Sequence, residues 1–73
     1  MTDKTIHLLE YKKICKTLKD QRLKLDLTQI DVAKKLKKPQ SYVSKYESCE
    51  RRLDILEIKK IIKILDMSFD DLF

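Results

Sequence analysis

The sequence predicts one compact all-α domain over residues 1–73, on three observations. Of the 73 residues, 42% are hydrophobic and 40% are charged, and the chain has no glycine and one proline. This composition is typical of helices joined by short turns and unlike that of a disordered chain. A chain of this length buries only about 60% of its unfolded surface, so a single core is expected.

The first helix is expected over about residues 6–24. Its apolar side chains recur at roughly helical spacing among lysines and glutamates, which is typical of an amphipathic helix. They are Leu9, Ile14, Leu18 and Leu25. A short break is expected at Asp26 and Leu27.

A second helix is expected over about residues 28–37. Thr28 is its N-cap candidate, and Asp31 follows three residues later in a variant of the capping box. Val32, Ala33 and Leu36 form the inner face of this helix. Pro39 lacks an N–H group and disfavours helical geometry at the residue before it, so a third helix is expected to begin near residue 40.

The third helix, over about residues 40–48, is polar along most of its length. Val43, Tyr46 and Glu47 lie on one side at positions i, i+3 and i+4. The opposite side carries only polar residues, namely Gln40, Ser41, Ser44, Lys45 and Ser48. A helix whose only task is to fill a core would be more apolar, so this helix is expected to present a functional surface.

The C-terminal third predicts two further helices. Asp54 is the N-cap candidate of a fourth helix. Its apolar stripe consists of Ile55, Ile58, Ile61, Ile62 and Leu65. Ser68 caps a short fifth helix with Asp70 and Asp71 in its first turn, where the helix dipole favours carboxylates. The expected fold is therefore a five-helix domain.

Positive charge is concentrated in one quarter of the chain. Seven positive and two negative side chains lie between Lys34 and Arg52, which accounts for the whole net charge of +5. The other 54 residues carry ten charges of each sign. Such a local excess favours a polyanion as partner, because each phosphate neutralised releases condensed counterions.

Two short helices joined by a tight turn, the second polar on its outer face, indicate a helix-turn-helix. Residues 18–72 resemble the lambda-repressor and Cro type of this motif, also called the xenobiotic-response-element family. The matching residues are Gln29, Val32, Ala33, Leu36, Val43 and Tyr46 in the core of the motif, with Arg22, Glu47, Arg51 and Arg52 around it.

The resemblance implies a sequence-specific DNA-binding protein whose third helix enters the major groove of double-stranded DNA. Amide, hydroxyl and ammonium groups suit base edges, so the expected base-reading residues are Gln40, Ser41 and Lys45, with Ser44 and Tyr42 as secondary candidates. The expected phosphate contacts are Gln29, Lys37, Lys38, Arg51 and Arg52. Arg22 and Glu47 are expected to form a structural salt bridge.

Three positions depart from the family pattern. Lys37 occupies the turn position usually held by glycine, where the backbone tends to positive φ, at an expected cost of about 1 kcal/mol. Cys49 stands where a glycine usually follows the third helix. Lys38 replaces an apolar residue. Both lysines add charge where phosphate would lie.

The sequence gives little support to an enzyme. Without glycine there is no P-loop and no dinucleotide-binding loop, and His7 is the only histidine. No cofactor and no metal site is expected, because helix capping explains Asp70 and Asp71. Cys15 and Cys49 have no metal-ligand spacing and are expected to be reduced thiols.

We expect a two-fold homodimer on a palindromic operator, because one short helix reads few base pairs. The interface candidates are Leu56, Ile64, Phe69, Leu72 and Phe73. The alternative is an antitoxin or adaptor whose partner is a protein, indicated by an apolar patch outside the core. No membrane-spanning run, signal peptide or sensor for a small ligand is evident, so a cytoplasmic repressor or restriction-modification-type controller is expected.

Overall fold

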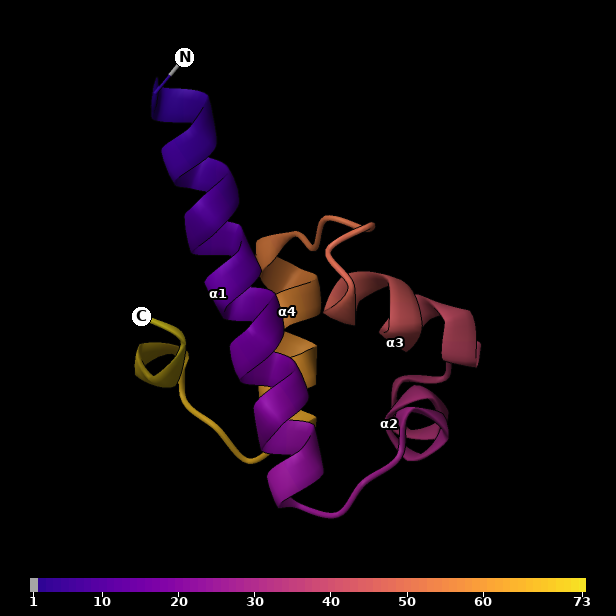
Figure 1. Cartoon of the computed structure of the whole chain (residues 1–73). Coiled ribbons are helices and arrows are strands. Elements are labelled where there is room, and N and C mark those ends of the chain that lie inside the picture. The colour runs from indigo at the N-terminus through magenta and orange to yellow at the C-terminus, as the bar shows by residue number, and fades with distance from the viewer. Residues whose placement is uncertain (1) are drawn as a thin grey trace.

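The computed structural model describes the backbone of residues 2–73 and the side chains of residues 8–73. In this part of the chain all regular structure is helical: α1 (Thr2–Lys24), α2 (Gln29–Leu36), α3 (Gln40–Glu47), α4 (Ile55–Ile64) and the 3-10 turn η1 (Phe69–Leu72) (Figure 1). The all-α prediction is confirmed. The sequence predicted a fifth helix at the C-terminus, and this is corrected: the segment forms a single 3-10 turn, η1. The side chain of His7 lies outside the described residues.

Capping boxes fix the starts of α2 and α4. The N–H of Asp31 donates to the Thr28 hydroxyl at 3.0 Å, and the N–H of Thr28 donates to the Asp31 carboxylate at 2.8 Å. Asp54 and Glu57 repeat the arrangement at α4 with distances of 2.8 and 2.9 Å. Each box satisfies two N–H groups that the first helical turn leaves unpaired. The predicted cap at Thr28 is confirmed.

Each α-helix is followed, one or two positions after its last residue, by a residue in the left-handed conformation, although the chain has no glycine. Asp26, Lys37, Cys49 and Asp66 have φ angles between 57° and 66°. At every one of these ends, the following N–H reaches back to a carbonyl five residues earlier, as Lys38 N–H does to the Ala33 carbonyl at 3.0 Å. This pairing is the Schellman motif, which satisfies the last carbonyls of a helix. The expected positive φ of Lys37 is thus confirmed, and the positive φ of Cys49 is a further finding.

The core forms where the inner faces of all the helices meet. Its buried apolar residues are Cys15, Leu18, Val32, Ala33, Val43, Tyr46, Leu53, Ile61, Ile62, Leu65 and Leu72. Three residues that were assigned to apolar stripes from their spacing, Leu9, Leu25 and Ile55, are exposed. Leu25 lies just beyond the end of α1 and Ile55 is the first residue of α4, while Leu9 lies in the N-terminal half of α1. Helical spacing alone does not show how far the neighbouring elements extend along a helix.

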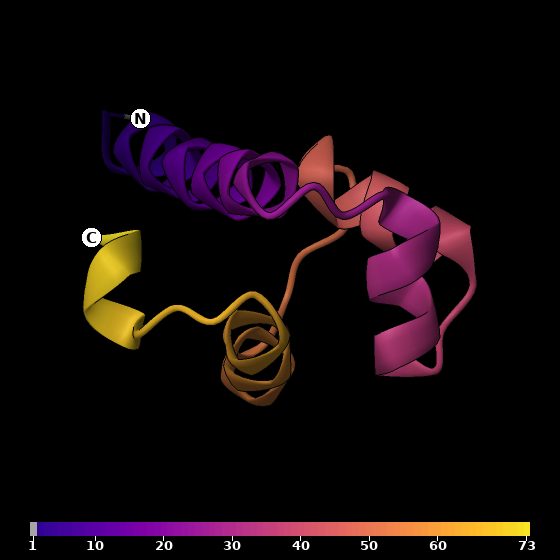
Figure 2. The same ribbon diagram turned by 90° about the horizontal axis from the view of Figure 1, so that it is seen from below.

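The pair α2 and α3 and the turn η1 lie on opposite sides of α1 and α4. Both ribbon views show α2 and α3 together on one side and η1 on the other (Figures 1 and 2). α3 contacts α1 and α2, while α2 also contacts α4, and η1 packs on α1. The pair α2 and α3 therefore has a free outer side. No helix within residues 2–73 is long and apolar enough to cross a membrane.

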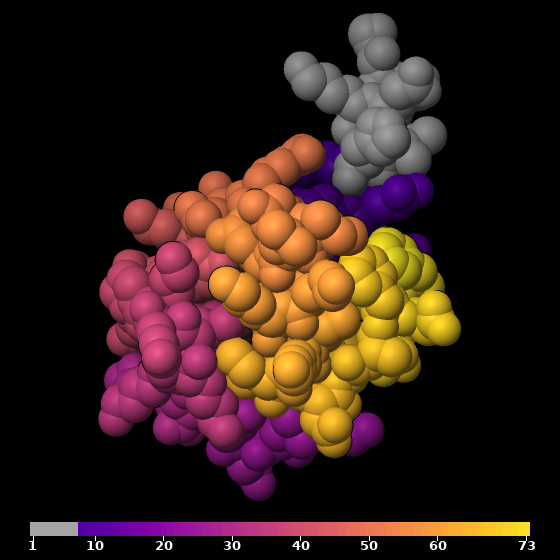
Figure 3. Space-filling model, turned by 180° about the vertical axis from the view of Figure 1, so that it is seen from behind, coloured from indigo at the N-terminus to yellow at the C-terminus, as the bar shows by residue number. Residues whose placement is uncertain are grey.

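The residues expected at a subunit interface differ in exposure. Leu56 and Phe73 are 64% and 83% exposed, whereas Ile64 and Phe69 are half-buried against the core. Leu72 is only 5% exposed and belongs to the core, which corrects its assignment as an interface residue. Figure 3 shows α4 and the C-terminal segment next to each other on the face seen from behind.

Candidate nucleic-acid interface

The outer side of α3 is polar and accessible. Gln40, Ser41, Ser44 and Lys45 are exposed, whereas Val43 and Tyr46 are fully buried. Pro39 precedes the helix with a φ of −70°, and no side chain caps the first turn. The four exposed side chains offer hydrogen-bond donors and acceptors to a ligand along the outer side of α3.

A buried ion pair holds α3 on α1. The Nε of Arg22 donates to Glu47 Oε2 at 2.6 Å, and its Nη2 donates to Oε1 at 3.0 Å. A third donor, Nη1, reaches the Leu27 carbonyl at 2.8 Å. The bonds to Glu47 raise the pKa of Arg22 above its already high ordinary value. This bidentate geometry fixes the angle between the two helices.

The ion pair continues into a chain of amides that reaches the start of α3. Gln29 Nε2 donates to Glu47 Oε1 at 3.0 Å, and Gln40 Nε2 donates to Gln29 Oε1 at 3.3 Å. Gln29 is the first residue of α2 and Gln40 the first of α3. The chain thereby fixes the orientation of the exposed Gln40 amide before any ligand binds. The Gln40 amide oxygen stays available as an acceptor.

Lys37 and Lys38 form the turn between α2 and α3. Both side chains are exposed, and the Lys38 ammonium lies 5.5 Å from the centre of the Tyr42 ring. The left-handed backbone of Lys37 lets α3 begin three residues later, at Gln40. Two positive charges thus lie next to the polar side of α3.

Arg51 and Tyr42 meet at Glu57, the third residue of α4. The Tyr42 hydroxyl and Arg51 Nη2 both donate to Glu57 Oε2 at 2.8 Å, and the guanidinium lies 4.8 Å from the Tyr42 ring centre. The Asp54 N–H, Arg51 and Tyr42 together lower the pKa of Glu57 to about 2. Burial and the Glu57 carboxylate raise the pKa of Tyr42 to about 12. The cluster links the side of α3 to the start of α4.

Arg52 lies beside Tyr11 of α1. Its guanidinium is 5.4 Å from the Tyr11 ring centre. The Tyr11 hydroxyl donates to the Arg51 carbonyl at 2.7 Å and accepts from the Leu53 N–H at 3.0 Å. Burial raises the pKa of Tyr11 to about 12. These contacts hold the loop that carries both arginines on α1.

The structure brings most of the predicted site residues onto one side of the molecule, around α3. Sequence reasoning missed Tyr11 and Glu57. The spacing Asp54-x-x-Glu57 is a capping-box signal and identifies Glu57 as part of a helix start. Nothing in the local sequence pairs Tyr11 with a loop forty residues away.

Comparison with known proteins decides the family. The family model described as helix-turn-helix, of the Cro and C1 type, matches residues 18–72, which is most of the chain. The chain belongs to this family. A search of curated proteins found no match, and a search of solved structures found none either.

The Cro-type helix-turn-helix consists of α2, the turn at residues 37–39, and α3. Membership makes the chain a DNA-binding regulator of the Cro and C1 kind. The exposed side of α3 and the surrounding lysines and arginines are its candidate DNA surface.

Proposed function

We propose that the protein regulates transcription by reading a specific sequence in the DNA major groove with α3. The observation that supports this most directly is the polar outer side of α3, which the buried Arg22–Glu47 pair holds in place. Gln40 can make a bidentate pair with adenine, and Lys45 can donate to guanine. Ser41 can form a hydrogen bond with either base. Ser44, one turn further along, is a secondary contact.

Phosphate contacts on either side of α3 fix its register. Lys37 and Lys38 supply them from the turn, and Arg51 and Arg52 from the loop after α3. Gln29 supplies one at the start of α2, where the helix dipole favours an anion. The Tyr42 hydroxyl is already used by Glu57, so Tyr42 serves the interface by supporting Arg51 rather than by reading a base.

The protein acts as a homodimer on a palindromic operator, as a repressor or a restriction-modification-type controller in the cytoplasm. The face that carries Leu56, Ile64, Phe69 and Phe73 supports this, because exposed leucine and phenylalanine side chains favour burial against a second copy. The same exposed residues also favour the alternative function, an antitoxin or adaptor that binds another protein through this face.

Selection from a random pool of DNA duplexes at about 0.15 M salt tests the proposal, because non-specific binding weakens with salt. Enrichment of a palindrome with half-sites about 10 base pairs apart is the expected result. Binding without enrichment that disappears as salt rises contradicts sequence reading and favours the protein-partner alternative. Sedimentation tests the dimer separately, and a monomer both free and on the selected duplex contradicts it.

A further inference from the structure

The Glu57 carboxylate accepts hydrogen bonds from three segments of the chain. Its Oε1 accepts from the Asp54 N–H at 2.9 Å, within the capping box of α4. Its Oε2 accepts from the Tyr42 hydroxyl of α3 and from Arg51 Nη2 of the loop after α3, each at 2.8 Å. The Glu57 side chain is 23% exposed and that of Arg51 is 44% exposed. Glu57 is thus held in place by several donors, and Arg51 is the more exposed member of the pair.

Arg51 is restrained along its backbone and at its side chain. Its N–H donates to the Lys45 carbonyl at 3.1 Å, and its carbonyl accepts from the Tyr11 hydroxyl at 2.7 Å. The guanidinium lies 4.8 Å from the centre of the Tyr42 ring, in addition to its bond to Glu57. A long side chain at the surface ordinarily samples several rotamers, whereas these contacts select one orientation of Arg51.

The bond to Glu57 leaves Arg51 able to bind a second anion. A guanidinium carries five N–H donors in one plane. Glu57 accepts from one of its nitrogens at 2.8 Å. The remaining donors match the oxygens of a phosphate group, which arginine binds through two parallel hydrogen bonds. Glu57 therefore orients Arg51 without using up its donors.

The two carboxylate oxygens of Glu57 have separate tasks. Oε1 completes the capping box with Asp54, a contact that serves the start of a helix. Among the described side chains, the equivalent acid at the start of α2, Asp31, bonds only to Thr28. The bonds of Glu57 Oε2 to Tyr42 and Arg51 therefore go beyond helix capping.

We propose that Glu57 is a positioning residue for DNA binding, which holds the Arg51 guanidinium in the orientation that contacts a phosphate beside α3. The inference rests on the proposed function, since it explains how that same surface binds the DNA backbone. Glu57 does not touch the DNA, because its carboxylate repels phosphate. It acts through Arg51, by removing most of the rotamer freedom that Arg51 would otherwise lose on binding.

This role and the charge of Glu57 have opposite effects on affinity. A negative charge near DNA repels the phosphates, so its removal alone would strengthen binding. Loss of the restraint on Arg51 would weaken binding instead, because ordering one long side chain costs about two- to tenfold in affinity. A comparison between two variants of equal net charge separates the two effects.

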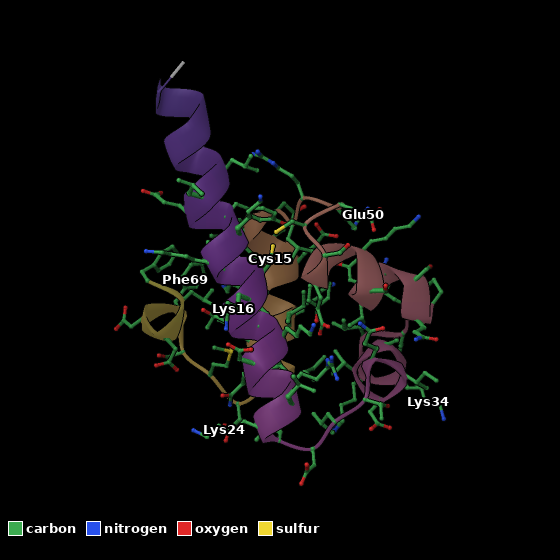
Figure 4. All side chains as sticks on the ribbon, viewed as in Figure 1. Cys15, Lys16, Lys24, Lys34, Glu50 and Phe69 are labelled. Carbon is green, nitrogen blue, oxygen red and sulfur yellow. The ribbon has the colours of Figure 1, made fainter. Side chains whose placement is uncertain are left out.

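Glu57→Gln and Glu50→Gln are these two variants. Glutamine at position 57 keeps an oxygen for the Asp54 N–H, which places its amide NH2 group toward Arg51, where two donors cannot bind one another. Glu50 immediately precedes Arg51 in the loop after α3 (Figure 4), and its carboxylate accepts from the Ser48 hydroxyl at 2.8 Å. Both substitutions remove one negative charge, and only Glu57→Gln releases Arg51.

The test measures the affinity of the full-length variants for a duplex selected by the wild-type protein, by fluorescence anisotropy at about 0.15 M salt. Folding is checked by circular dichroism at the temperature of the measurement. Glu57→Gln is expected to bind about two- to tenfold more weakly than Glu50→Gln. Equal affinity, or tighter binding by Glu57→Gln, would overturn the positioning role.

The same two variants in an Arg51→Ala background show whether Glu57 acts through Arg51. The difference in affinity is expected to disappear there, since no guanidinium is left to position. A difference that persists would overturn the inference, because it would arise from a change elsewhere in the fold. Selection of a duplex by wild type with no difference between the variants would reject the positioning role and leave the proposed function standing. A wild-type protein that selects no duplex would contradict both.

Discussion

The Arg22 guanidinium and the Glu47 carboxylate form an ion pair whose side chains are only 9% and 3% exposed. The pair joins α1 to the last turn of α3 and, through Gln29, orients the first side chain of α3. Because both charges are buried, removing one leaves the other without compensation.

Arg22→Ala is therefore expected to lower the free energy of unfolding by about 3–5 kcal/mol, since it leaves the Glu47 carboxylate buried and unpaired. Urea denaturation measures this loss. Lys16→Ala is the matched control, because the Lys16–Asp20 pair is 76% and 56% exposed. Its removal is expected to cost less than about 1 kcal/mol. Similar losses in the two variants would contradict a special role for the buried pair.

Lys37→Gly is expected to stabilise the protein by about 1 kcal/mol, because glycine adopts the left-handed conformation without steric cost. Lys37 has a φ of 59°. Urea denaturation again provides the measurement. Lys35→Gly, inside α2, is the opposite control and is expected to destabilise by about 1 kcal/mol. Destabilisation by both glycines would mean that the turn depends on the Lys37 side chain.

Glu57→Gln is expected to lower Tm at neutral pH. Glutamine still accepts the Asp54 N–H through its amide oxygen, but it cannot form the ion pair with Arg51. The variant therefore separates the charge of Glu57 from its part in the capping box.

The pH dependence of this difference follows from the lowered pKa of Glu57. The carboxylate ordinarily titrates near 4.5 and titrates at about 2 in the folded protein. Its contribution to stability is complete above pH 4.5 and disappears as the pH falls through about 2. The Tm gap between wild type and Glu57→Gln is thus expected to be constant from pH 7 to 5 and to narrow below pH 4.5. A gap that persists unchanged to pH 2 would exclude the carboxylate charge as its cause.

Lys38→Ala is expected to reduce the slope of log K against log salt by about 0.9 while leaving the preference for the selected operator over a scrambled duplex unchanged. The physical reason is the loss of one phosphate contact in the turn before α3. Fluorescence anisotropy at several salt concentrations gives the slope. Lys16→Ala, on the side of α1 that faces η1 (Figure 4), is the charge-matched control. If Lys16→Ala reduced the slope by the same amount, DNA binding would depend on the net charge of the protein and not on a phosphate contact of Lys38.

Local signals accounted for most of the fold. The starts of α2 and α3 and the turn at Lys37 follow from caps, proline and backbone preference, which act within a few residues. Leu9 and Ile55 were misplaced because a helical stripe does not show how far the neighbouring helices extend along it. Leu72 was placed at an interface because the sequence does not show that η1 packs on α1.

The site was predicted less completely than the fold. The residues around α3 were identified from the resemblance and from charge. The contacts that support them were not, because Tyr11 bonds to Arg51 across forty positions and Tyr42 bonds to Glu57 across fifteen. Contacts between distant segments depend on how the helices pack, and the residue pattern of a single sequence does not predict that packing.

The most direct test of base reading by α3 is a repeat of the duplex selection with Gln40→Ala in place of wild type. We expect the motif to lose information at one base position in each half-site, with affinity for the wild-type operator reduced by about 1–3 kcal/mol and the other positions unchanged. An unchanged motif, or equal weakening on every duplex, would contradict the assignment of Gln40 to the major groove.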